Sequence, residues 1–214
     1  MPTIAQLVAV EVAPLMKDAG FRRRGSEFTL DGPDGLAGVV SLRADNRGAD
    51  GLLGVSLAYG VVTPALREYR ASKGAAPFPF PSVDEALVWK EVRHPFHVVD
   101  RENTFLFPFR WALPDGQSAR LGALLRRALV EEVIPGVRAL FDTEVQVRML
   151  HLPPDTGWRG FEPKAGEVLA RLRYGPDDPR TKTALAALPP DDDFRAWVSR
   201  TYPSSPADIT FGNA

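Results

Sequence analysis

Three predicted strands between residues 27 and 59 limit the fold of this chain more than any other feature. Residues 27–31 and 36–44 are separated by Gly-Pro-Asp-Gly at positions 32–35, residue types that favour a hairpin turn. After a polar loop at 45–51, residues 53–59 alternate between large apolar or aromatic side chains and small ones, which is typical of a sheet with one buried face. The three segments therefore predict an antiparallel meander.

Two amphipathic helices are predicted in addition to this meander. The first ends at Gly20, which suits the left-handed residue after a helix, and Pro14 predicts a kink or a division into two short helices. Its apolar residues recur at helical spacing at Ile4, Leu7, Val8, Val12, Leu15 and Met16. The second helix begins at Asp115 or Ser118 and ends near Pro135, with a weaker continuation to Phe141. Its apolar stripe consists of Leu121, Leu124, Leu125, Ala128, Leu129 and Val133.

The rest of the chain alternates between short apolar runs and proline-rich connections. Further strands are predicted at Leu87–Arg93, at Asn103–Leu113 and, briefly, at Val145–Leu150. The prolines of residues 71–83 exclude regular helix and central strand, so this segment is predicted to be a stiff connection. From residue 155 onward, short apolar runs separated by proline- and aspartate-rich turns predict a set of small helices.

These elements together predict an α+β fold. Residues 1–150 form the predicted core domain, an antiparallel sheet of four to six strands with the two main helices on one face. Residues 151–214 form a predicted helical C-terminal extension packed on that core. This division places the main hydrophobic core under the sheet and leaves the extension as an appendage.

Composition and charge exclude several classes of protein. The 214 residues include 26 Lys and Arg against 27 Asp and Glu, so the formal net charge of −1 gives no overall field that attracts nucleic acid or an anionic membrane. No stretch approaches the roughly 20 apolar residues that a membrane span needs. The absence of cysteine removes disulfides, thiol nucleophiles and thiolate metal sites. We therefore expect a cytoplasmic protein, with neither a membrane nor a nucleic acid as its partner.

Two interpretations of the basic run Arg22–Arg24 stay open. At the end of the first helix these guanidinium groups are favoured by the helix dipole and can bond to its last carbonyl groups. Alternatively, two of them can hold a phosphate or carboxylate group bidentately. The first interpretation is favoured, because helix N-termini rather than C-termini are the usual anion sites.

The strand predicted at Asn103–Leu113 carries an aromatic face. Its members are Phe105, Phe107, Phe109 and Trp111. This face is best interpreted as the buried side of a strand under the long helix. Because Pro108 cannot donate a ladder hydrogen bond, the strand is also predicted to lie at an edge or to carry a bulge. An aromatic edge beside Trp89 and Arg110 can line a ligand groove.

The three histidines of the chain do not predict a metal site. His94 and His97 stand near Asp100 and Glu102, and only His151 remains elsewhere. Around a turn, side chains three residues apart point to opposite faces, unlike the pair four residues apart that binds zinc on a helix. The chain also has neither a glycine-rich phosphate loop nor a serine nucleophile elbow. We therefore expect no metal and no cofactor, and whether the protein is an enzyme stays open.

The first part of the chain carries an ordered set of motifs. Ala13-Pro14-Leu15 is followed by Gly20-Phe21-Arg22-Arg23-Arg24-Gly25 and then by Phe28. In this order the chain resembles an uncharacterised bacterial family known only as a domain of unknown function, whose members open with a helix, end it with Gly-Phe and a basic run, and enter a strand through Gly-x-x-Phe. The resemblance covers residues 1–142 and implies a sheet with a closing helix. It implies no activity, because the family has none assigned.

Two functions are compatible with these observations. We predict a non-enzymatic protein-binding domain, with a toxin-neutralising role as one form of it, which recognises its partner through an exposed sheet edge or the cleft between the sheet and the extension. The alternative is an enzyme or binding protein for a small anionic or phosphorylated ligand, with His94 or His97 as the acid–base group. The residues predicted to bind the ligand are Arg23, Trp89, Arg93, His94, His97 and Arg110.

Overall fold

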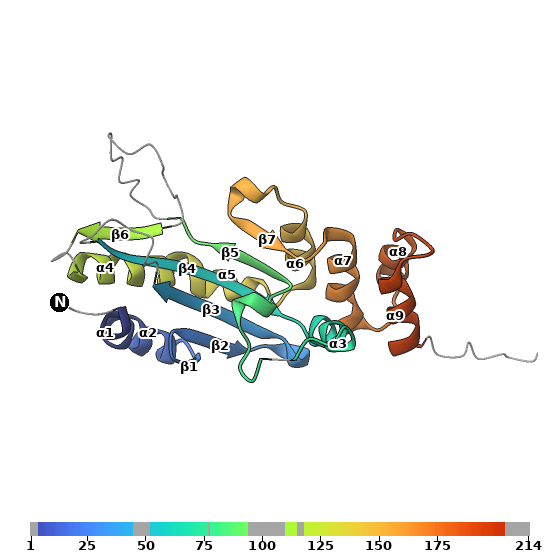
Figure 1. Ribbon diagram of the computed structural model, residues 1–214, viewed down its shortest axis with the longest axis horizontal. Coiled ribbons are helices and arrows are strands. Elements are labelled where there is room, and N and C mark those ends of the chain that lie inside the picture. The colour runs from blue at the N-terminus through green and yellow to red at the C-terminus, as the bar shows by residue number, and fades with distance from the viewer. Residues whose placement is uncertain (1–3, 45–51, 77, 94–109, 115–117, 204–214) are drawn as a thin grey trace, which may run out of the picture.

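The computed structural model describes residues 4–44, 52–76, 78–93, 110–114 and 118–203 (Figure 1). Its centre is a seven-stranded antiparallel sheet, so the α+β fold class is confirmed. The strands are β1 (Arg22–Arg24), β2 (Glu27–Asp31), β3 (Ala37–Ala44), β4 (Leu52–Val62), β5 (Val88–Glu91), β6 (Arg110–Pro114) and β7 (Trp158–Gly160). Their order is β1-β2-β3-β4-β5-β7, and β6 pairs with β4 on the same side as β5.

The predicted meander is β2-β3-β4. The turn between β2 and β3 contains Asp34 and Gly35, both with positive φ, and its short η2 helix (Pro33–Gly35) brings Asp31 opposite Ala37. The basic run was expected at the end of the first helix and forms β1 instead, because Gly20 at φ 93° reverses the chain there. Phe21 N–H then donates to Met16 carbonyl, a bond that closes the helix one residue before β1.

Both main helices contain a π-helical turn that ends two residues before a proline. The first consists of α1 (Ile4–Leu7), η1 (Val8–Val12) and α2 (Ala13–Asp18), and the second of α4 (Ser118–Ala128), η4 (Leu129–Val133) and α5 (Ile134–Ala139). Pro14 and Pro135 each occupy the second position of the segment that follows the π turn. Because proline has no N–H and clashes with the carbonyl four residues earlier, the wider turn lets each helix continue past it.

The main core lies between these helices and one face of the sheet. Figure 1 shows α4 and α5 running along the sheet, and the residues they cover alternate along the strands. The largest fully buried side chains of this core are Met16, Phe28, Leu42, Leu57, Leu121, Leu125, Leu129 and Leu140. Two main helices on one face of the sheet, as predicted, therefore supply most of its apolar cover.

A second apolar cluster lies among α3 and the C-terminal helices, whose arrangement Figure 1 shows. Its helices are α3 (Pro64–Ser72), α7 (Pro163–Arg171), η6 (Leu172–Tyr174), α8 (Pro179–Ala186) and α9 (Asp193–Thr201). The remaining short helices are η3 (Val83–Glu85) and η5 (Pro154–Thr156). The boundary predicted at residue 150 stays a prediction. Elements on the two sides of this boundary contact each other, because α3 contacts α7 and β7 pairs with β5.

The strand predicted at Val145–Leu150 is wrong, because these residues belong to helix α6 (Thr143–Leu150). The Asp142 side chain accepts hydrogen bonds from the N–H groups of Glu144 and Val145, which fixes the start of this helix. The aromatic segment Phe105–Phe109 lies outside the described residues. No helix in the described part of the chain is long and apolar enough to cross a membrane.

Candidate functional site

Strand β7 forms one outer edge of the sheet, and some of its backbone groups have no partner among the residues that the structure describes. It pairs with β5 through Lys90 and Trp158, Trp89 and Arg159, and Val88 and Gly160. Beyond its ends, Glu91 N–H donates to Gly157 carbonyl and Phe161 N–H donates to Leu87 carbonyl. Residues 157, 159 and 161 therefore point their backbone groups toward β5, and those of Trp158 and Gly160 point outward. Trp158 N–H reaches Thr156 Oγ1 at 3.4 Å, whereas no described strand pairs with this outer side.

A cavity of about 570 Å³ adjoins this edge. We call it the β7 cavity, and its lining residues are Trp89, Met149, Leu150, His151, Leu152, Pro154, Trp158, Arg159, Gly160, Phe161 and Pro163. Trp89 and Arg159 lie on the face of the sheet opposite the main helices, whereas Leu150 packs under Gly160 on the helix-covered face. Because side chains from both faces line it, the cavity extends around the edge of β7.

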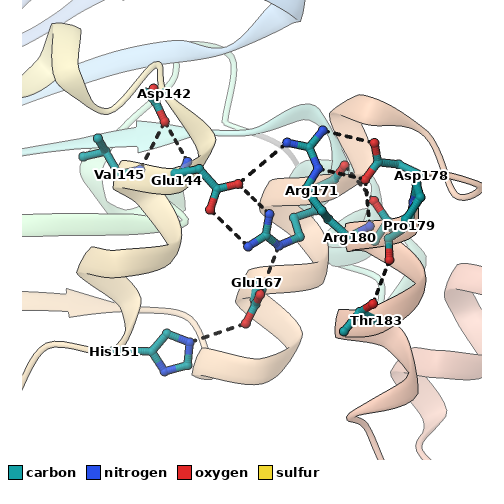
Figure 2. Close-up of polar contacts among 11 residues, drawn as sticks. Asp142, Glu144, Val145, His151, Glu167, Arg171, Asp178, Pro179, Arg180 and Thr183 are labelled. Carbon is teal, nitrogen blue, oxygen red and sulfur yellow. Dashed lines mark hydrogen bonds and ion pairs between the residues drawn. The ribbon is translucent and has the colours of Figure 1, made fainter.

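An ion-pair network joins the two helices that border the β7 cavity (Figure 2). Arg171 on α7 donates to both carboxylate oxygens of Glu144 on α6, at 2.6 and 3.2 Å, and to Glu167 at 3.0 Å. Its side chain is only 10% exposed, and the hydrogen bonds to Glu144 raise the pKa of its guanidinium group. His151, which lines the cavity, lies 3.6 Å from Glu167. The network therefore links a cavity-lining residue to the contact between α6 and α7.

Replacing Arg171 by methionine is expected to lower the free energy of unfolding by about 1.5 to 3 kcal/mol, because Glu167 and Glu144 lose their charged donor. Urea denaturation measures this loss. Arg127→Met is the matched control, since Arg127 pairs with Glu131 on an exposed helix face and should lose less than about 0.5 kcal/mol. Equal losses in the two variants would show that the network does not hold α6 and α7 together.

Charged side chains also surround the β7 cavity. The Arg159 side chain is exposed and forms no hydrogen bond or ion pair within the described part of the chain. Arg93 donates to the Asp155 carbonyl in the segment that leads into β7. Lys90, on the opposite face from Trp89, pairs with Glu132 at 2.6 Å and lies over the Trp158 ring. Among the residues that the structure describes, Arg159 is therefore the arginine that lines the cavity with its side chain unpaired.

The opposite edge of the sheet, strand β1, is strongly basic. All three residues of β1 are exposed arginines, and Arg22 pairs with Asp31 at 2.6 Å. Arg23 donates to the Gly25 carbonyl at 2.7 Å and lies over the Phe28 ring. Charged side chains on an edge strand oppose pairing with another chain. Strand β7, with Trp158 and Gly160 on either side of its single arginine, lacks this protection.

The predicted ligand-binding residues fall into three groups. Trp89 lines the β7 cavity, and Arg93 contacts the segment beside it. Arg23 lies on β1, and β2, β3 and β4 separate that strand from β5. Arg110 lies on β6 opposite Ser56, and His94 and His97 lie outside the described residues. The structure therefore places Trp89 at the cavity and Arg93 against the segment that leads into β7, whereas Arg23 lies at the opposite edge of the sheet.

Sequence reasoning missed the edge strand itself. Trp158, Arg159 and Gly160 form too short a run to show a periodic pattern, and they follow the turn at Gly157, which has φ 86°. The single available signal was an aromatic residue directly after a Pro-Pro-Asp-Thr-Gly turn sequence. That signal marks a strand start but cannot identify the neighbouring strand.

Two other polar regions are less suited to ligand binding. On the face of the sheet opposite the main helices, Glu27 accepts a hydrogen bond from Ser41 and lies near Arg43. Burial raises the pKa of the Glu27 carboxyl. Ser41 is buried, and the Glu27 and Arg43 side chains already pair with each other. A smaller cavity of about 230 Å³ contains Arg173, which pairs with Asp34, and Tyr202, which pairs with Glu68. These four side chains already have partners.

Comparison with family models, with curated proteins and with solved structures found no match to this chain. The resemblance of its N-terminal motifs to a family of unknown function therefore stays a prediction. Within the described residues, no group of three or more His, Cys, Asp or Glu side chains could hold a metal ion. The function must accordingly be argued from the geometry of the β7 edge and its cavity.

Proposed function

We propose that this protein binds another protein by accepting an extended segment of it alongside β7. The outward backbone groups of Gly160 and the outward carbonyl of Trp158 carry the proposal, because their natural partners are the backbone groups of an added strand. Main-chain hydrogen bonds of this kind supply affinity, and neighbouring pockets supply specificity. A non-enzymatic protein-binding domain was the prediction from the sequence, and a toxin as the partner remains one form of that prediction.

The β7 cavity also supports the proposal, because it can accommodate side chains of the partner. It adjoins all three residues of β7, and its walls include the aromatic rings of Trp89, Trp158 and Phe161. Apolar pockets with a few polar groups are typical of binding sites. The contrast between the two edges adds further support, because β1 carries three exposed arginines and β7 carries one.

The alternative, a site for a small anionic ligand, receives less support. It required Arg23, Arg93 and Arg110 to hold one anion together. Arg23 and β5 are separated by three strands, and the Arg23 guanidinium already bonds to Gly25. We therefore retain the protein-binding proposal alone.

Selection from a displayed library of random linear peptides tests the proposal. We expect the protein to select peptides that it binds, and Leu152→Lys to weaken their binding about tenfold or more, because a charge then enters the cavity wall. Leu185→Lys on α8 is the matched control, since Leu185 is also half-buried but lies away from the cavity. Thermal unfolding establishes that both variants fold. Recovery of no peptide, or equal binding by the two variants, would overturn the proposal.

A further inference from the structure

We infer that the partner segment carries an acidic side chain between two large apolar ones, an inference that rests on the proposed strand addition at β7. Side chains of a strand alternate between the two faces of its sheet, so residues beside Trp158 and Gly160 face one side and the residue beside Arg159 faces the other. The three positions differ in the charge of the neighbouring side chains and in the room that is left for a partner's side chain. These differences therefore specify which side chain fits each position.

The position beside Arg159 favours an acidic residue. Arg159 lies on the face opposite the main helices, together with Trp89, its direct partner across the strand pair. Glu91 lies on the same face two residues along β5, and Arg159 forms no ion pair with it or with any other described residue. In an antiparallel addition, the residue opposite Arg159 belongs to a non-hydrogen-bonded pair, in which the two side chains approach most closely. A carboxylate at this position pairs with the guanidinium group across the strands.

The two flanking positions favour large apolar side chains. Both point to the helix-covered side, where Met149 and Leu150 of α6 and the following Leu152 line the cavity. Gly160 has no side chain, and the space above its Cα is limited by Leu150, whose Cδ2 would lie 2.7 Å from any Cβ at this position. A partner side chain beside Gly160 therefore meets no β7 side chain there. A large apolar residue at this position packs against Leu150, which fills the space above Gly160.

Peptides recovered with the displayed library test this inference through a charge exchange. Arg159→Glu should weaken the binding of a selected acidic peptide about three- to tenfold, and replacing the peptide's acidic residue by lysine should restore binding to this variant but weaken binding to the unaltered protein. Arg24→Glu is the matched control, because Arg24 is an exposed arginine at the opposite edge, and it should leave binding unchanged.

The outcomes separate the inference from the proposed function. If Leu152→Lys abolishes binding but Arg159→Glu has no effect, the partner segment binds at β7, and the inference of an acidic residue opposite Arg159 is wrong. If the selected peptides lack an acidic residue between apolar ones, the inference is overturned in the same way. If no peptide is recovered, or if Leu152→Lys leaves binding intact, strand addition at β7 itself fails.

Discussion

Replacing Leu125 by alanine is expected to lower the free energy of unfolding by about 2 to 5 kcal/mol. Leu125 is 0% exposed and lies on α4, in the core between the main helices and the sheet. The loss combines the transfer of the missing methyl groups with the cavity that they leave, because the neighbours are themselves fully buried and can relax only in part. Urea denaturation at neutral pH measures it.

Val130→Ala on the same continuous helix is the control for Leu125→Ala. Val130 is 53% exposed, so its truncation should change stability by less than about 0.5 kcal/mol. A loss below about 1 kcal/mol for Leu125→Ala would contradict the assignment of this helix to the main core.

Replacing Trp197 by alanine should lower the free energy of unfolding by about 3 to 5 kcal/mol. Trp197 is 5% exposed on α9, and its ring lies 5.0 Å from Tyr69 of α3 and 5.5 Å from Phe194. Tyr69 lies on α3, which connects the sheet strands β4 and β5 along the chain. The contact therefore joins the C-terminal helices to the part of the molecule that contains the sheet. Denaturation followed by far-UV circular dichroism, which does not depend on tryptophan fluorescence, measures the loss.

Phe78→Ala is the control for Trp197→Ala, since Phe78 is an exposed aromatic residue and its truncation should cost less than about 1 kcal/mol. We expect one cooperative transition in the unaltered protein. A loss below about 1 kcal/mol for Trp197→Ala, or a first step in the unaltered protein that unfolds only the C-terminal helices, would contradict this coupling.

The fold was predictable where local patterns agree with the tertiary structure. The hairpin turn and the period-two residues of β2, β3 and β4 identify the meander, and Gly20 identifies the end of the first helix. The segment Val145–Leu150 was predicted to be a strand because Val145, Val147 and Met149 alternate with polar residues. The Asp142 cap favours a helix there, and the buried polar residue Gln146 donates a hydrogen bond to the Leu140 carbonyl.

The candidate site was less predictable than the fold. Trp89 could be singled out as an aromatic residue beside a predicted edge, and it does line the β7 cavity. The edge itself is formed by residues 158–160, which lie 68 to 72 positions after their partners in β5. Local spacing carries no information about such a pairing. The cavity also depends on how α6 and α7 meet through Arg171, a contact between distant residues.

Amide hydrogen exchange in the presence of a selected peptide tests strand addition at β7 most directly. The Gly160 N–H points outward and should exchange about tenfold or more slowly once an added strand accepts its hydrogen bond. The Arg159 N–H points toward β5 and should change little, so it serves as the internal reference. A peptide that binds while the Gly160 amide exchanges at its original rate would contradict strand addition at β7.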